Sequence, residues 1–198
     1  MEFQHFNVKL LLKNPEEINL EYLIPVFHRW IQDQNGSELL LDVADYRHVR
    51  SGPGVVLIGH EGNYSLDNAD GRLGVRYNRK APMAGTNQDR LIQALQASLE
   101  ACQRLESESR LAGTLLFNGH EIEVLINDRL LAPNSKTTRA AVQAELPPLF
   151  AALFAGGEYA VSYREDPRVL LSFGVKTSRA YDTSTLLNNL CSLSPAPR

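Results

Sequence analysis

The chain has 198 residues, of which 43% are apolar and 22% charged, the composition of a soluble globular protein with one large or two small domains. Its formal net charge of −3 argues against nucleic acid as the main ligand. The longest apolar runs span only a few residues, so we expect neither a signal peptide nor a membrane span. Cys102 and Cys191 form neither a metal-binding spacing nor a disulfide framework, so we expect a cytoplasmic protein without a cofactor.

The first half of the chain predicts strands that alternate with two helices. Asn35-Gly36 ends the first helix, and Thr86 with Asp89 resembles a capping box at the start of the second. Asp70-Gly71 tolerates positive φ and predicts a turn. We expect a strand at 6–13, a helix at 25–34, strands at 38–44 and 54–59, a hairpin of 63–66 with 72–80, and a helix at 86–106.

The second half predicts two hairpins and two helices. Asn118-Gly119 is a strong turn signal between two apolar runs, and it predicts the first of these hairpins. Pro147-Pro148 interrupts the longer helix. We expect a hairpin of 113–118 with 121–127, a helix at 138–155, a hairpin of 158–163 with 169–175, a helix at 183–193 and a frayed tail at 194–198.

One amphipathic helix sequence occurs twice, as EYLIPVFHRWI at 21–31 and as AELPPLFAALF at 144–154. A shift of 123 positions places Pro25 on Pro148, and each copy then starts a helix with a proline, which suits the first helical turn. The same shift aligns the apolar residues of the two copies. We therefore expect Phe27, Trp30, Phe150 and Phe154 to lie in the core.

The order of the elements, β-α-β-β-α in each half, is that of a ferredoxin-like unit. The sequence therefore predicts an α+β protein of two tandem ferredoxin-like units from an internal duplication, with antiparallel sheets and the helices on one face. The first unit is expected at 1–118, with the inserted hairpin at 63–80, and the second at 119–198. This fold carries enzymes, regulators and binding domains alike.

Three residues are candidates for catalysis: Asp45, His48 and His60. Asp45 and His48 lie in a polar segment between two strands, where a loop could bring them together, and an Asp that orients a His can support a general base. No nucleophile motif such as G-x-S-x-G is present. A loop with local side-chain to backbone hydrogen bonds explains the same residues.

Two His-Glu pairs, His60-Glu61 and His120-Glu121, carry ligand types that zinc or iron would accept. Neighbouring residues on a strand point to opposite faces, so the members of each pair would not converge. The motif H-E-x-x-H is also absent. We interpret these residues as polar groups that flank turns, and we expect no metal site.

The segment GRLGVRYNRK contains a basic stripe. On a strand, Arg72, Arg76 and Lys80 would share one face, where they could bind an anionic group. The alternative is a solvated face with cross-strand ion pairs. Only Asp67 and Asp70 are near in sequence, and neither would reach Lys80, so we expect the stripe to be available to an anion.

We therefore expect a non-catalytic binding or assembly protein, an adaptor that uses a sheet surface or edge and the basic residues of 72–80 to meet an acidic protein partner. One alternative is a regulatory protein that binds a small anionic ligand between the two units. A second alternative is an enzyme that uses Asp45 with His48, or His60. The sequence names no pathway and no oligomeric state.

Overall fold

The computed structural model describes residues 1–15, 18–111 and 113–193; the predicted tail at 194–198 lies outside these ranges. Within them the protein is α+β, with one antiparallel sheet of eight strands and five α-helices. The strands are β1 (Phe6–Leu12), β2 (Leu40–Tyr46), β3 (Gly54–Gly59), β4 (Gly62–Asp67), β5 (Gly74–Arg79), β6 (Phe117–Ile126), β7 (Tyr159–Tyr163) and β8 (Leu171–Thr177). The helices are α1 (Leu23–Asp33), α2 (Asn87–Ser107), α3 (Lys136–Glu145), α4 (Pro147–Leu153) and α5 (Thr183–Cys191). No helix in these ranges has the length and apolar character that crossing a lipid bilayer requires.

The sheet has the strand order β2-β3-β4-β5-β1-β6-β8-β7, and every neighbouring pair is antiparallel. It follows that β1 runs parallel to β2, with three strands between them, and that β6 runs parallel to β7, with β8 between them. The pair β1–β6 joins the two halves of the chain. The sequence predicts a sheet in each unit, whereas the structure has a single continuous one.

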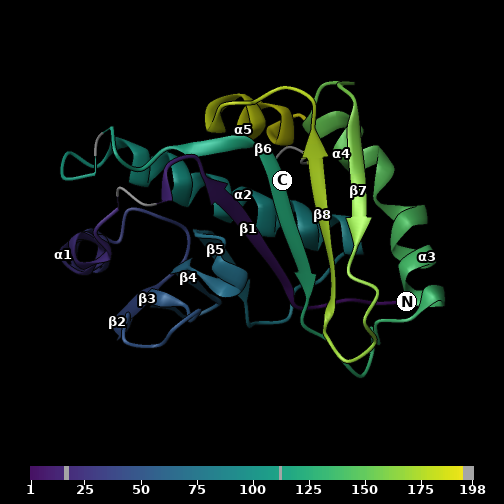
Figure 1. The fold of residues 1–198 in the computed structure, drawn as a ribbon, viewed down its shortest axis with the longest axis horizontal. Coiled ribbons are helices and arrows are strands. Elements are labelled where there is room, and N and C mark those ends of the chain that lie inside the picture. Colours follow the sequence, from purple (N-terminus) through teal and green to yellow (C-terminus); the bar gives the residue numbers. More distant parts are fainter. Residues whose placement is uncertain (16–17, 112, 194–198) are drawn as a thin grey trace.

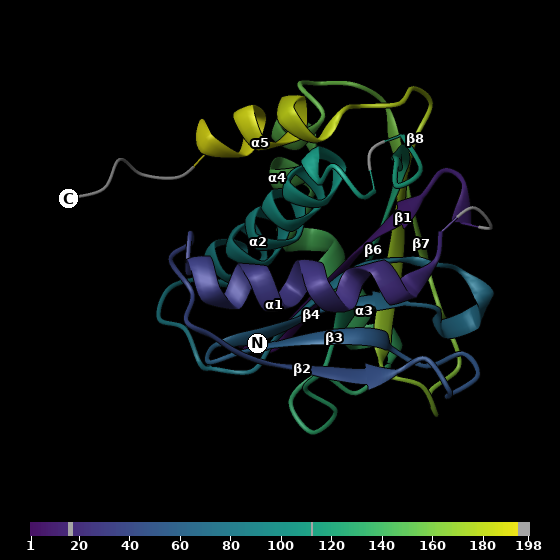
Figure 2. The same cartoon turned by 90° about the vertical axis from the view of Figure 1, so that its left-hand side faces the viewer.

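The helices lie against one face of this sheet (Figures 1 and 2). The sheet is strongly twisted, as expected for adjacent strands: in Figure 2, β2 and β3 run across the view while β7 and β8 run up it. Because side chains alternate along a strand, Phe6, Val8 and Leu10 of β1 point toward the helices. Asn7 and Lys9 point to the opposite face, which none of the helices in the described ranges covers; we call it the uncovered face.

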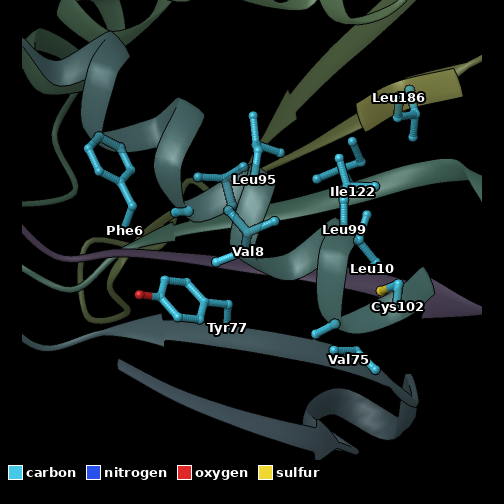
Figure 3. Packing of buried hydrophobic residues seen from close by; sticks show 14 of the residues in the cluster. Phe6, Val8, Leu10, Val75, Tyr77, Leu95, Leu99, Cys102, Ile122 and Leu186 are labelled. Atoms are coloured by element: carbon cyan, nitrogen blue, oxygen red, sulfur yellow. The ribbon is translucent and has the colours of Figure 1, made fainter. Parts of the chain in front are cut away.

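The core lies between the sheet and α2. In Figure 3, Val8 of β1 lies beside Tyr77 of β5, Leu10 lies beside Val75, and Leu95 and Leu99 of α2 face them; all six are at most 5% exposed. The C-terminal half adds an aromatic cluster in which rings of α4 meet rings of β7 and β8 at centroid distances of 5.7–6.3 Å. The four residues predicted to be buried are confirmed, with exposures of 1–3%: Phe27, Trp30, Phe150 and Phe154.

Several local predictions are confirmed. The side chain of Thr86 accepts a hydrogen bond from the backbone N–H of Asp89, and the Asp89 carboxylate accepts one from the Thr86 N–H, which completes a capping box. The long C-terminal helix is interrupted before Pro147 and continues as α4. The hairpins β4–β5 and β7–β8 form where turn residues predict them.

The predicted hairpin at Asn118-Gly119 is wrong, because both residues lie inside β6. Gly119 has φ +66°, and a Cβ there would lie 2.2 Å from the carbonyl oxygen of Tyr181. The glycine is therefore required by the close approach of the chain before α5, which also donates a hydrogen bond from the Tyr181 N–H to the Gly119 oxygen at 3.0 Å. The turn signal marks a contact with a distant segment, not a change of strand.

Candidate functional site

The centre of the uncovered face holds three charged side chains in direct contact. Lys9 of β1 is 2% exposed and Asp67 at the end of β4 is 3% exposed. The Lys9 Nζ lies 2.8 Å from Asp67 Oδ1, and the Arg76 Nη1 lies 3.1 Å from Asp67 Oδ2. Asp67 Oδ1 also accepts a hydrogen bond from the Ala69 N–H at 3.1 Å. One carboxylate therefore pairs with two cations; we call Lys9, Asp67 and Arg76 the buried triad.

Burial changes the titration of Lys9. Loss of solvation lowers the pKa of its ammonium group, and the hydrogen bond and charge of Asp67 act in the opposite direction. The positive charge of Arg76 adds to the lowering. Burial of the Lys9 ammonium group loses solvation free energy, and the attraction of the single Asp67 carboxylate must offset this loss.

A second charged group lies on β6 beside the triad. Arg72 places its Nη1 2.6 Å from Glu123 Oε1 and its Nη2 2.8 Å from Glu121 Oε2. Lys176 of β8, which is largely exposed, approaches Glu121 Oε2 at 3.4 Å. Because Lys9 pairs in register with Glu123 across β1 and β6, the two groups are neighbours on the same surface.

An ion pair between distant segments borders this surface. Asp70 lies in the turn between β4 and β5, Arg164 follows β7, and the Arg164 Nη2 donates to Asp70 Oδ2. This hydrogen bond lowers the pKa of Asp70 and raises that of Arg164. The two segments come from opposite sides of β1 and β6 in the strand order, so the ion pair joins the two halves of the chain.

A cavity of about 160 Å³ lies among these groups. Its lining combines the charged residues above with polar groups of β1, β7 and β8: Asn7, Lys9, Asp70, Arg72, Arg76, Glu121, Glu123, Ser162, Arg164, Ser172 and Gly174 are among its residues. Asn7 is 7% exposed, and its Oδ1 has no hydrogen-bond partner in the described part of the chain. Such an unpaired buried acceptor is costly in a folded protein, and it faces the one side of the sheet on which no helix packs.

The structure places the predicted basic residues differently from one another. Arg76 lies within β5, while Arg72 precedes this strand and Lys80 follows it. Arg72 and Arg76 both line the cavity. Lys80 is exposed, and its Nζ donates to the carbonyl oxygen of Gly59 at 2.6 Å. The sequence indicated Asp67 and Asp70 as the nearby acids; Asp67 does pair with Arg76, while Arg72 pairs with Glu121 and Glu123 of β6, which are distant in sequence.

Among the described residues, no hydrogen bond joins the catalytic candidates Asp45 and His48. Arg47 forms two side-chain hydrogen bonds to Asp45 through its Nε and one through its Nη2, which lowers the pKa of Asp45 to about 2. His48 is exposed in the same loop. Asp45 pairs with Val55 near the start of β3, while His60 follows the far end of that strand. Within the described ranges, no three His, Cys, Asp or Glu residues lie together as a metal site would require.

Glu38 marks a different polar site, on the covered side of the sheet. Its carboxylate accepts hydrogen bonds from the Gly62 N–H and from the Tyr64 hydroxyl, the latter at 2.8 Å. Burial raises the pKa of Glu38, and the two hydrogen bonds lower it in part. A cavity of about 90 Å³ beside it is lined by Trp30 and Arg104, whose guanidinium lies 4.1 Å from the centre of the Trp30 ring. The charged groups of this site, Glu38 and Arg104, are therefore already paired with protein groups.

Sequence reasoning missed the acids and the lysine that complete the site on the uncovered face. The signal was present: Asn7 and Lys9 alternate with apolar residues in β1, and Glu121 and Glu123 do so in β6. Period-two alternation places each pair on one face. It does not say which strands become neighbours, and the pairing of β1 with β6 was needed to join them.

Comparison of the sequence with models of protein families and with curated proteins gives no match. The functional argument therefore rests on the geometry of the uncovered face.

Proposed function

We propose that this protein is a non-catalytic binding protein, and that it recognises an acidic group of a protein partner at the buried triad on the uncovered face of its sheet. Arg76 is the residue that meets the partner. Its side chain is 24% exposed and lines the cavity, and Lys9 lies beneath it in the adjacent strand.

The burial of the triad is the observation that carries this proposal. Taking Lys9 and Asp67 out of water costs free energy that their mutual attraction offsets only in part, and apolar side chains of similar size often give equal or greater stability. Stability alone therefore does not account for three charged groups in the middle of a sheet. A role in binding does, because a partner's carboxylate would supply the second negative charge that Lys9 and Arg76 lack.

Arg76 retains hydrogen-bonding capacity. Among the described residues, Arg76 forms its ion pair from Nη1 to Asp67, and a guanidinium offers five N–H donors in a planar fork that matches a carboxylate. Lys9 cannot take this role itself, because it is almost inaccessible. We expect it to add positive potential beneath the site of contact.

The test is the binding of a dye-labelled poly-L-glutamate, followed by fluorescence anisotropy at increasing salt. Binding should weaken as salt rises, because exposed charges are screened beyond about 8 Å at physiological ionic strength. The substitution Arg76→Gln should weaken binding about tenfold, which corresponds to ~1.4 kcal/mol.

The matched control is Lys136→Gln, which removes one positive charge from an exposed position at the start of α3. It should bind poly-L-glutamate as the wild type does. Equal affinity of wild type and Arg76→Gln, or equal losses in both variants, would contradict the proposal, because the interaction would then depend on overall charge or on another surface.

A small anionic ligand held between the two predicted units is the second candidate function. The position of the cavity favours it: β1 belongs to the first unit, β6 and β8 to the second, and all three line the cavity. Inorganic phosphate added at constant ionic strength should then raise the melting temperature, since a ligand that binds only the folded state stabilises it. No contact in the described part of the chain favours the enzymatic alternative.

We also infer that the two halves arose by duplication, with ferredoxin-like units joined through β1 and β6. The support is the parallel pair β1 and β2 around α1, and the parallel pair β6 and β7 around α3 and α4. Superposition of residues 6–44 on residues 121–163 in an experimentally determined structure tests this inference. Helices on opposite sides of the superposed strands would refute it.

A further inference from the structure

The cavity on the uncovered face has two ends of opposite charge. At one end, Lys9 and Arg76 share the single carboxylate of Asp67, which leaves one positive charge in excess. At the other end, Glu121 and Glu123 share the guanidinium of Arg72. Lys176 contributes to Glu121 only from an exposed position at 3.4 Å, where solvent screens it.

The two ends are close enough for one small molecule to reach both. Arg76 pairs in register with Lys9, and Lys9 pairs with Glu123, so the positive and negative ends are separated by two strand spacings, or about 10 Å between backbones. The long side chains of Arg76 and Glu123 both line the same cavity. The distance left between their charged tips is therefore shorter than the backbone separation.

Asn7 supplies a third point of contact. It lines the cavity, its side chain is buried, and its Oδ1 is an acceptor with no donor. An acceptor in that position can take a hydrogen bond from a donor of a bound ligand. An ammonium group, with three N–H donors, would satisfy Asn7 and a carboxylate of the negative end together, which a simple anion such as phosphate would not do.

The floor of the cavity is open above Gly174. An added Cβ at this residue would meet only Ser162 Oγ at 3.4 Å and Glu121 Oε1 at 3.9 Å, both ordinary contact distances. The total volume of about 160 Å³ is close to that of an engineered cavity of about 150 Å³ that binds benzene. The space therefore fits a molecule of a few heavy atoms, or a single side chain of a partner.

We propose that this cavity binds a small zwitterion of the amino-acid type, with its carboxylate on Arg76 and its ammonium between Glu123 and Asn7. The proposal rests on the proposed function in so far as both use the uncovered face. It goes further because it assigns the cavity a ligand with two charges, whose carboxylate would compete with that of an acidic partner for Arg76.

The test measures the melting temperature of the full chain with each of the common free L-amino acids, at constant ionic strength and pH. Propionate and propylamine, each at the same concentration, carry only one of the two charges. At least one amino acid should raise the melting temperature by several degrees at a concentration roughly 100 times its Kd. Neither propionate nor propylamine should reproduce this shift.

The variant Gly174→Val fills the cavity without changing a charge, and its strand position accepts a β-branched side chain. It should keep the melting temperature of the wild type and lose the shift caused by the amino acid. The matched control is Ala160→Val, at an exposed position of β7 that does not line the cavity. It should retain the full shift.

Three results would overturn the proposal. An equal shift with propionate would show that a single negative charge is enough, and the absence of any shift would show that no such zwitterion binds. A full shift in Gly174→Val would place the ligand elsewhere. Each result leaves the binding of poly-L-glutamate and its loss in Arg76→Gln as a separate test, so failure of the zwitterion proposal is distinguishable from failure of the proposed function.

Discussion

The two faces of β1 bury side chains to the same extent but with opposite chemistry. Val8 is 0% exposed and packs against α2, whereas Lys9, the next residue, is 2% exposed and contacts Asp67 on the other face. On the covered face, burial removes apolar surface from water and stabilises the fold by about 1.5–3 kcal/mol for a large side chain. On the uncovered face, burial removes charges from water and costs free energy.

This difference separates what folds the protein from what we propose it does. The covered face could lose any one polar contact and keep its core, because its stability comes from apolar area. The uncovered face depends on a balance in which one carboxylate serves two cations.

The largest effect is expected on the covered face, for Phe150→Ala. Phe150 is 1% exposed and contacts Phe154, Tyr159 and Phe173. Its loss should cost about 3–5 kcal/mol of unfolding free energy if the cavity stays unfilled. Denaturant melts measure it, with Leu130→Ala at a 96% exposed position as the control that should change little. A loss below about 1 kcal/mol would contradict the position of α4 in the core.

The next effect is expected on the uncovered face, for Asp67→Asn. This change leaves both Lys9 and Arg76 without their carboxylate, and breaking a buried ion pair in this way costs about 3 kcal/mol. Lys9→Met should cost clearly less, because Asp67 keeps Arg76 and the methionine side chain suits an apolar environment. Urea denaturation at neutral pH measures both variants.

The double variant Lys9→Met, Asp67→Asn sharpens this prediction. It should be more stable than Asp67→Asn alone, because Lys9→Met removes the buried positive charge that Asp67→Asn leaves unpaired. Additive losses in the double variant would show that Lys9 and Asp67 do not interact, and would contradict the burial argument for the triad.

The smallest effect concerns the pH dependence contributed by Glu38. Because burial raises its pKa above the ordinary value of 4.5, the folded protein binds more protons than the unfolded chain between the two values. Stability from this group is therefore full below pH 4.5 and falls as pH rises through the raised pKa. Glu38→Gln should remove this part of the pH dependence, measured as the difference between its thermal melts and those of the wild type at acid and neutral pH. An unchanged difference across that range would contradict the raised pKa.

Much of the fold could be predicted because local signals and burial agree. The run Gly54–Gly59 is apolar throughout and forms β3 with those bounds, and Thr86 with Asp89 fixes the start of α2. The turn predicted at Asn118-Gly119 is wrong because Gly119 is required by its close contact with Tyr181, 62 positions away. A local turn signal cannot be told from such a contact without the tertiary structure.

The site was predicted less well for the same reason. Arg72 and Arg76 were found because they lie close together in the sequence, on one basic stripe. Their acids Glu121 and Glu123 come from β6, and Arg164 from the chain after β7. These contacts depend on the order of the strands in the sheet. Alternation along a strand predicts which face a side chain occupies, but it does not predict which strands are neighbours.

The central claim is that the uncovered face is the binding surface, and an NMR titration of the ¹⁵N-labelled protein with poly-L-glutamate tests it most directly. The account predicts that the amide shifts which change most are those of β1, β5, β6 and β8 around Lys9, Arg76, Glu123 and Gly174, and that they return to their free positions as salt is added. Shifts that cluster instead on α3 or on the exposed edge strand β2, or no shifts at all, would contradict it.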